Sequence, residues 1–373
     1  LAHGSFADVC FIENTGRWAF DMEPRYTIGL SVTEKGDDRV IRWCGPFTSE
    51  KDFRAQAQDL ASVPADEFVN WSDSAAFPLL ADTESAEILR QLMTSLAFGA
   101  TQSDREFALI QGDMNATKDK AVFDFDVDEA RGRIAVTTGA GFNLWNPDAG
   151  LPYAYSSPSV LRPYLADKFA RAIRTSRSAY SGMELPRGQL QMDKARIAYR
   201  GIARATDTRT AIVCLLPPGR AVVDPAHLVM TRRGNAADEA FLLGVMASLP
   251  FDWSARRWVE LHLTFGILKR LPVPWNGFDS SAGQRVRRIA GQLAACDDRY
   301  ADWASEVGVP VGSVKMPAEK DDLIAELDAL VSLLYGLSED QVEHLFATFH
   351  RGWKYEPRLE AVIQHYQAWK GKA

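Results

Sequence analysis

The sequence predicts a mixed α+β fold, α/β in its central part, that begins with strands and ends with helices. Three observations support this. Residues 7–45 contain β-rich runs joined by turn residues. Residues 161–275 mix short apolar runs with segments of helical spacing, and residues 279–370 show mainly helical spacing. With 373 residues, the chain is long enough for two or three domains and a sizeable core.

Composition and cysteine usage exclude several protein classes. The hydrophobic share of 46% and the charged share of 24% are ordinary for a folded soluble protein. No run of eighteen apolar residues predicts a membrane span, and the start LAHGSFADVC has neither part of a signal peptide. The four cysteines are far apart and form no CxxC pair. We therefore expect reduced thiols, a cytoplasmic protein and no metal site.

The first hundred residues divide into a strand region and a helical region. ADVCFIEN and RYTIGLSV are expected to pair antiparallel, because the connection between them is too short for a helical crossover, and VIRWCGPF suggests a third strand. SEKDFRAQAQDLASV and DTESAEILRQLMTSLAFG have helical spacing with Ser or Asp near their starts. The intervening DEFVNWSDSAAFPLL is expected to be irregular.

The middle of the chain is expected to mix strands, loops and helices. Residues 101–160 are rich in Gly, Asn, Asp, Pro and Ser, which indicates turns between short strands. RTAIVCLLPP is typical of a buried strand. AADEAFLLGVMASLP shows helical spacing, and the prolines of LPVP end the pattern.

The last hundred residues predict four helices. The first is SAGQRVRRIAGQLAACDDRYADWASEV, and the second is KDDLIAELDALVSLLYGL, which should end near Gly336. The third, SEDQVEHLFATF, begins with a capping-type Ser338. The fourth is EPRLEAVIQHYQAWKGKA.

Charge is distributed unevenly along the chain. The formal net charge is -7, yet residues 160–270 contain eighteen Lys and Arg against nine Asp and Glu. The stretch RIAYRGIARATDTRT holds four arginines: Arg196, Arg200, Arg204 and Arg209. A basic segment in an acidic chain is the footprint expected of a polyanion site, because arginine binds phosphates and guanine edges. Alternatively, these arginines form a solvated face or pair internally, for example with Asp207 or Asp252.

No catalytic constellation is evident. The chain has no P-loop and no G-x-S-x-G, and TTGAGFN offers only Gly139 and Gly141 of a glycine-rich motif. The acids Asp124, Asp126 and Asp128 alternate, as metal-dependent nucleases could use them, but such alternation is more typical of the solvent face of an edge strand. These features favour a recognition module, with no catalytic residue, metal or cofactor in this chain.

Two patterns in the right order resemble a known family. RIAYRGIARATDTRTAIVCLLPPG, followed by FLLGVMASLPFDWSARRWVELHLTFGILKRLPVP, resembles the target-recognition half of adenine-N6 DNA methyltransferases of the type IIG restriction–modification kind and of the BREX and DISARM phage-defence systems. The matching positions are 196–210, 217–218, 242–256 and 268–274. DDLIAELDALVSLLYGLSEDQVEHLFATF looks like that family's closing helices, and FIENTGRWAFDMEPRYTIGLSV like the last antiparallel strands of a methyltransferase sheet.

The resemblance implies a domain order and a function. Residues 1–47 would end a methyltransferase-like sheet, 48–104 form a helical connector, 105–275 a DNA target-recognition domain and 276–373 a C-terminal helical region. The implied function is sequence-specific recognition of double-stranded DNA that directs adenine-N6 methylation. The family's N-P-P-Y-type and glycine-rich S-adenosylmethionine motifs are absent. S-adenosylmethionine is therefore expected in the parent enzyme, on an upstream methyltransferase domain or a partner subunit, and this chain alone should not methylate DNA.

Residues that read DNA usually lie on loops projecting from a fixed scaffold. The best candidates therefore come from RAIRTSRSAYSGMELPRGQLQ, with Lys168 and Arg171 placed to neutralise phosphates. The whole predicted DNA-binding set is Lys168, Arg171, Arg174, Arg177, Tyr180, Arg187, Gln189, Arg196, Arg200, Arg204 and Arg209. For the last four a structural role is equally open, and Arg200 and Arg204 favour it.

Three further residues have two interpretations. Trp145 in a Gly/Pro-rich loop could fill the gap left by a flipped base, although a loop Trp more often packs in a core. Arg256 or Arg257 could pair with Asp252 while the other points at DNA.

Two other functions stay open at this stage. The chain could be an interaction or structural subunit of a defence complex that binds an acidic partner protein. A nuclease using the alternating acids is disfavoured. A strong salt dependence of DNA binding would favour DNA recognition over both. Tight binding to an acidic partner, with no affinity for duplex DNA, would favour the interaction subunit.

Overall fold

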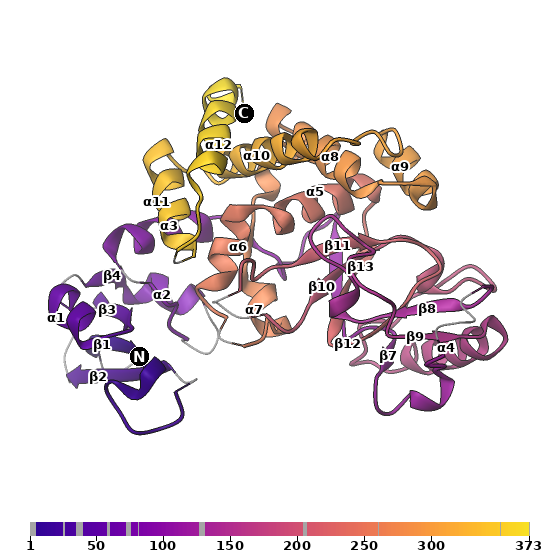
Figure 1. The fold of residues 1–373 in the computed structure, drawn as a ribbon, viewed down its shortest axis with the longest axis horizontal. Helices are drawn as coiled ribbons and strands as arrows, with labels where there is room; N and C mark the ends of the chain where they lie inside the picture. Colours follow the sequence, from indigo (N-terminus) through magenta and orange to yellow (C-terminus); the bar gives the residue numbers. More distant parts are fainter. Residues whose placement is uncertain are drawn as a thin grey trace.

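The computed structural model describes residues 5–24, 27–34, 40–57, 60–71, 76–80, 82–126, 131–203, 207–259, 261–350 and 352–372. It has the mixed α/β fold that the sequence predicts, with small sheets and a helical C-terminal region. Figure 1 shows an arch: an N-terminal lobe and a second β-containing lobe stand on either side, and the C-terminal helices span the top.

The N-terminal lobe is built on a four-stranded sheet in the order β2-β1-β3-β4. Its strands are β1 (Ser5–Glu13), β2 (Thr27–Glu34), β3 (Val40–Phe47) and β4 (Ala61–Pro64). β1 and β2 pair antiparallel, as predicted from their short connection, and β3, the predicted third strand, runs parallel to β1. Trp43 of β3 is fully buried and packs edge-on against Phe68 and Trp71, which closes the lobe's core.

The helices of this lobe correct two sequence predictions. They are α1 (Glu50–Gln56), α2 (Ala65–Trp71) and α3 (Thr83–Met93). The helix predicted over 49–63 ends at Gln56, because 61–64 is recruited as edge strand β4 beside β3. The stretch expected to be irregular contains α2, whose Phe68 and Trp71 are buried against the sheet. Tertiary burial therefore outweighs the weak local pattern there.

A central antiparallel sheet in the order β11-β10-β13-β6 forms the middle of the molecule. Its strands are β6 (Glu106–Ile110), β10 (Arg196–Arg200), β11 (Val213–Leu216) and β13 (Ala226–Arg233). All four residues of β11 are buried, as predicted from the continuous apolar run. β6 pairs with β13 on one side only, so it is an edge of this sheet.

The second lobe is formed by residues that lie in the chain between strands β6 and β13 of the central sheet. Its sheet, in the order β7-β12-β8-β9, comprises β7 (Met114–Asn115), β8 (Ile134–Thr137), β9 (Ala154–Ser156) and β12 (Ala221–Asp224). Helix α4 (Pro158–Ala172) packs on it through the buried Leu161 and Leu165. A two-residue ladder, β5 (Leu96–Ala97) with β14 (Pro272–Val273), connects the central region to α3.

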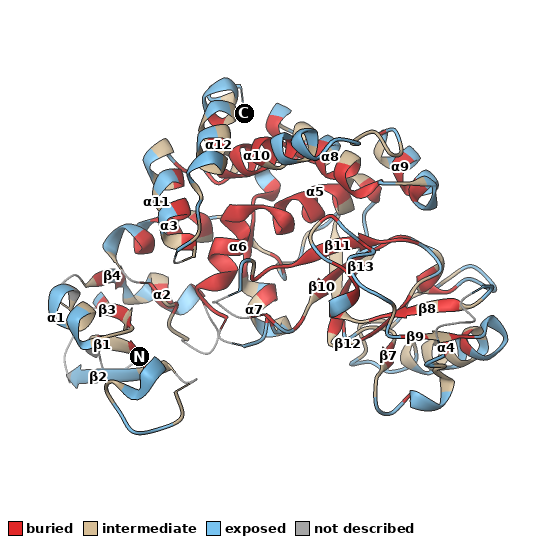
Figure 2. Ribbon diagram, viewed as in Figure 1, coloured by how far each residue is buried: buried red, intermediate tan, exposed pale blue. Residues whose placement is uncertain are grey.

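The remaining helices cover the central sheet and form the top of the arch. They are α5 (Ala236–Ala247), α6 (Leu249–Arg256), α7 (Phe265–Arg270), α8 (Ser281–Ala294), α9 (Ala301–Val307), α10 (Pro317–Leu334), α11 (Glu339–Phe349) and α12 (Glu356–Trp369). Figure 2 shows that α5 and α6 are buried along almost their whole length, so they form the central core.

The four predicted C-terminal helices are present with one correction. The segment expected as one helix over 281–307 is broken into α8 and α9, because the Asp297 side chain accepts a hydrogen bond from the backbone N–H of Arg299 and starts a new turn. Gly336, with φ of 71°, follows the end of α10, and Ser338 caps α11 in a capping box, both as predicted.

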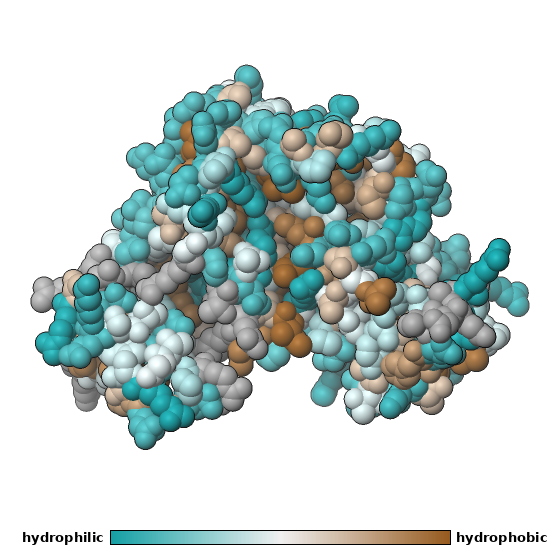
Figure 3. Space-filling model, in the orientation of Figure 1, coloured by the Kyte–Doolittle hydropathy of each residue, from teal (hydrophilic) through white to brown (hydrophobic). Residues whose placement is uncertain are grey.

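The arch has a concave side between the two lobes. In Figure 3 hydrophilic residues cover most of the visible face, and hydrophobic ones gather in the hollow between the lobes, near α7. Ile202 and Leu261 are large apolar side chains left 53% and 42% exposed. Within the described residues, none of the helices combines the length and apolarity needed to cross a membrane.

Candidate nucleic-acid interface

The connection between α4 and β10, residues 173–195, is a basic surface loop. It is held by successive tight turns, in which the N–H of Ser178 donates to Thr175 O and the N–H of Met183 to Tyr180 O. Gly182 and Gly188 take positive φ angles, 69° and 82°, that let the chain reverse. The loop is therefore shaped by its own backbone. Its apolar side chains, such as Leu190 and Met192, pack inward, while several of its polar side chains are exposed.

Four of the predicted DNA-binding residues project from this loop: Arg174, Arg177, Arg187 and Gln189. All four are exposed. Within the described part of the chain, their side chains make no hydrogen bond or ion pair. An unpaired guanidinium on a surface loop keeps its full capacity for a phosphate or a base edge.

Arg177 also lines a groove of about 680 Å³ along the open edge of β6. The groove's other basic side chains are Arg105, Arg232, Arg233 and Lys269. Arg232 donates to the carbonyl oxygens of Ala179 and Ser181, at 3.1 and 2.7 Å, and so ties the basic loop to β13.

The groove keeps a positive surplus. Arg232 and Arg233 share the single carboxylate of Glu106, at 3.2 and 3.6 Å. Arg105 is different, because it pairs with the buried Asp238 at 2.6 Å and stacks over the Phe278 ring. Lys269 is exposed at the end of α7. Several cations around one carboxylate make this groove a site for an anion.

Lys168 and Arg171, the predicted phosphate contacts, lie on α4 and each has a carboxylate partner. The Lys168 ammonium is 2.8 Å from Asp119, which also accepts a hydrogen bond of 2.5 Å from Tyr164. Burial opposes ionisation of Asp119, but the hydrogen bonds from Lys168 and Tyr164 hold its pKa below the usual value. Arg171 pairs with Asp167 one turn earlier, and both side chains are largely exposed.

The arginines of the RIAYRGIARATDTRT stretch are placed differently. Arg196 is 9% exposed and makes a two-pronged ion pair with Asp113, at 2.6 and 2.9 Å. It also donates to Arg220 O at 2.7 Å, while Asp113 accepts from the N–H of Val222. Arg196 thus joins the turn after β6 to the start of β12.

Arg209 belongs to a buried network around Asp252, which has no exposed surface. The two side chains form an ion pair of 2.5 Å, the internal pairing raised as an alternative from the sequence. Asp252 also accepts from the N–H groups of Thr210 and Ala211, at 3.0 and 2.7 Å. Arg209 donates to Ala247 O at 2.6 Å. The network therefore fixes the chain before β11 to the start of α6.

Arg200 is half-buried, and its guanidinium donates to the carbonyl oxygen of Phe142. Burial lowers its pKa, and the carboxylate of Asp207 acts in the opposite direction. Its side chain also lies against Gly139, and residues 139–141 of the glycine-rich TTGAGFN form a short 3-10 turn. Arg204 lies outside the described residues.

Burial decides the three residues that had two interpretations: it overturns the DNA contact for Arg256 and Arg257 and confirms the core packing expected more often for Trp145. Arg256 is 4% exposed and donates to Thr210 Oγ1 and Phe349 O, and Arg257 is 8% exposed and lies over the Trp253 ring. Neither reaches the surface to contact DNA. Trp145 is 4% exposed, packed in the main core, and cannot insert into a duplex from this position.

The alternating acids form no metal site within the described residues. Asp124 pairs with Arg133, and Asp126 is exposed on the same segment. Asp128 lies outside the described residues. No group of three or more potential metal ligands is present among the residues that the structure describes.

Sequence reasoning counted Arg232, Arg233 and Lys269 in the basic segment but did not single them out. Their only sequence signal was charge. They approach Arg177 because β13 and α7 fold back beside β6, which no local pattern encodes.

Comparisons with known proteins find similarity in solved structures alone. No protein-family model and no curated protein matches the sequence. The chain is similar to the type IIL restriction-modification enzyme MmeI, solved in complex with DNA, with a TM-score of 0.40, 12% identity, and coverage of 99% of this chain and 46% of that chain. It is also similar to the type IIG restriction endonuclease BpuSI, with a TM-score of 0.31, 10% identity, and coverage of 89% and 44%. The chain thus spans less than half the length of these enzymes.

Proposed function

We propose that this chain is a DNA-recognition module, and that the basic loop 173–195 and the groove along β6 bind double-stranded DNA. The observation that carries the proposal is the cluster of Arg174, Arg177 and Arg187, which are exposed and lack a partner among the described residues.

Two classes of arginine have two tasks in this proposal. Arg196, Arg209 and Arg256 are buried and bonded within the protein, so they hold the recognition region together. The loop arginines contact phosphates and base edges, with Gln189 able to pair with adenine through its amide. Lys168 and Arg171 each form an ion pair with a carboxylate of the protein, so they would add weaker phosphate contacts at the side of the site.

The finer proposal is that the module directs adenine-N6 methylation in restriction–modification or phage defence. Its support is the two separate patterns at 196–210 and 242–256, which occur in the order found in that methyltransferase family and resemble it. S-adenosylmethionine and the catalytic residues would then be supplied by an upstream methyltransferase domain or by a partner subunit. The activity of the full enzyme would need both parts.

The test is binding of this chain to duplex DNA across a salt series. We expect salt-sensitive binding, and we expect Arg177→Ala and Arg187→Ala each to weaken it and to reduce the slope of log K against log salt by about 0.9. Arg54→Ala is the matched control, because Arg54 is an exposed arginine on α1 of the other lobe. Binding that responds to all three substitutions alike would contradict the assignment of the site.

The rival function, an interaction subunit that binds an acidic protein, predicts a different result. In that case the chain would not bind duplex DNA at low salt, even when the methyltransferase half is added. It would instead bind an acidic polypeptide such as poly-glutamate, and the loop substitutions would weaken that binding.

A further inference from the structure

A smaller cavity of about 200 Å³ adjoins the basic groove. It lies between α4, the basic loop and the turn after β6. Ser178 and Tyr180 line both the cavity and the groove, so the two spaces meet at these residues. The groove is basic, whereas the cavity is mainly apolar.

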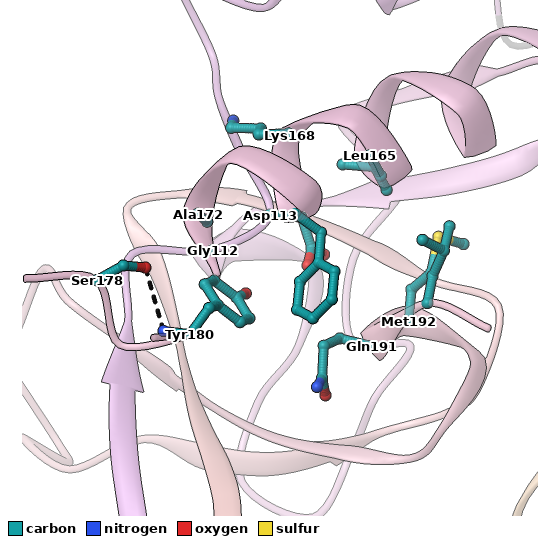
Figure 4. Close-up of a pocket in the computed structure, with 11 residues that line it drawn as sticks. Gly112, Asp113, Leu165, Lys168, Ala172, Ser178, Tyr180, Gln191 and Met192 are labelled. Carbon is teal, nitrogen blue, oxygen red and sulfur yellow. Dashed lines mark hydrogen bonds between the residues drawn. The ribbon is translucent and has the colours of Figure 1, made fainter. Parts of the chain in front are cut away.

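The cavity walls offer apolar surface against which an aromatic ring could pack. Leu165, Phe169 and Met192 supply apolar surface. In Figure 4 Tyr180 enters from one side, Met192 lies on the opposite side, and Asp113 and Gln191 lie between them. The Phe169 and Tyr180 rings meet edge to face, with centroids 5.4 Å apart and planes at 84°, so both are fixed by packing.

Two polar groups of the cavity can bind a ligand. Within the described residues, neither the Tyr180 hydroxyl nor the Gln191 amide makes a hydrogen bond. Burial and the nearby Asp113 carboxylate raise the pKa of Tyr180, so its hydroxyl keeps its proton and can donate. Asp113 is satisfied by Arg196 and by the N–H of Val222, so the cavity holds no uncompensated negative charge that would select a cation.

We propose that the cavity and the groove together bind one nucleotide unit, with the base in the cavity and its phosphate beside Arg177. The volume is below the roughly 300 Å³ of sites for drug-sized ligands, which suits a single nucleobase. Gln191 supplies a donor and an acceptor for a base edge. If the nucleotide is extruded from a bound duplex, this inference rests on the proposed function. If the ligand is a free nucleotide, the inference does not depend on duplex binding.

Extrusion of a base costs a few kcal/mol and least at a mismatch, so a mismatched base is the best probe. The duplex arm uses an oligonucleotide with one mismatched 2-aminopurine, whose fluorescence rises when the base leaves the stack. The free arm titrates the chain with deoxyadenosine monophosphate, with deoxyadenosine and with inorganic phosphate.

Ala172→Phe is the blocking variant, because Ala172 lines the cavity on α4. Ala166→Phe is its matched control, since Ala166 is exposed on the same helix and does not line the cavity. Gln191→Ala removes a polar group from the cavity without adding volume. It replaces Ala172→Phe as the test variant if Ala172→Phe lowers the melting temperature.

We expect a fluorescence rise, or binding of deoxyadenosine monophosphate tighter than of deoxyadenosine or phosphate alone. Ala172→Phe or Gln191→Ala should reduce it at least fivefold, and Ala166→Phe should leave it unchanged. A response in the duplex arm alone identifies an extruded base, and one in the free arm alone a free nucleotide. If the chain binds duplex DNA but shows neither the fluorescence rise nor mononucleotide binding, this inference is overturned and the proposed function stands. If the chain binds the mononucleotide but not duplex DNA, the proposed function is overturned and this inference stands.

Discussion

Replacing Asp252 by Asn should destabilise the protein strongly without touching its surface. Asp252 has no exposed area, and the Arg209 side chain that it pairs with is 11% exposed. The substitution removes the negative charge and leaves the buried guanidinium without its ion-pair partner. It also leaves one oxygen where two accepted the N–H groups of Thr210 and Ala211.

The size of the effect follows from that burial. Breaking a buried ion pair by removing one partner costs about 3–5 kcal/mol, and the weakened backbone hydrogen bonds are part of the same loss. For a protein of this size, at about 2 °C per kcal/mol, the melting temperature should fall by on the order of 5–10 °C. Glu50→Gln is the control, because its pair with Arg54 is 67% and 76% exposed and is worth at most about 1 kcal/mol.

The assay combines thermal melting with the DNA salt series. Asp252→Asn and Arg209→Ala should both melt early, and adding Arg209→Met to Asp252→Asn should recover part of the loss, since the uncompensated charge is gone. Arg209→Ala should leave the salt slope of DNA binding unchanged. An Asp252→Asn protein that melts within 1 °C of the parent would refute the reasoning. So would an Arg209→Ala protein of normal stability whose salt slope falls by about one.

Two further predictions concern the helices. Burial disfavours charging His344, but its contacts with Asp82 at 3.2 Å and Glu84 at 3.0 Å raise its pKa above 6.5. The stabilising contact between α11 and α3 should therefore be fully present below pH 6.5 and weaken as the pH rises through the raised pKa. Melting curves across pH 6 to 9 should show this loss and His344→Gln should flatten the profile, whereas a parent melting temperature that does not fall would contradict the prediction. Gly283→Ala should lower the free energy of unfolding by at least about 2 kcal/mol, because an added Cβ would lie 2.1 and 2.5 Å from two carbonyl oxygens before α8. Gly266→Ala, in the exposed part of α7, should instead raise it by about 0.5–1 kcal/mol. Equal melting temperatures for these two variants would exclude the clash.

Periodicity and capping signals were sufficient for the elements with strong local patterns. β11 is a continuous apolar run, α11 carries its capping box, and α10 ends where Gly336 permits a left-handed residue. The failures occur where tertiary contacts decide. The segment over 61–64 became a strand because β3 offers it an edge, and α2 formed because its aromatic side chains complete the core around Trp43.

The candidate DNA-binding site shows the same contrast between local sequence signals and tertiary contacts. The sequence by itself determined that a basic segment exists in an acidic chain, and it predicted a projecting loop over 171–191 and a helix that carries Phe251, Asp252 and Trp253. It could not separate arginines that face solvent from arginines that face carboxylates, because residue type and spacing are the same for both. Only the tertiary structure decided that Arg196 meets Asp113 and Arg209 meets Asp252, at separations of 83 and 43 positions along the chain. It also brought Arg232, Arg233 and Lys269 to the groove beside Arg177, since charge on a strand and charge on a distant helix become one site only when the chain folds them together.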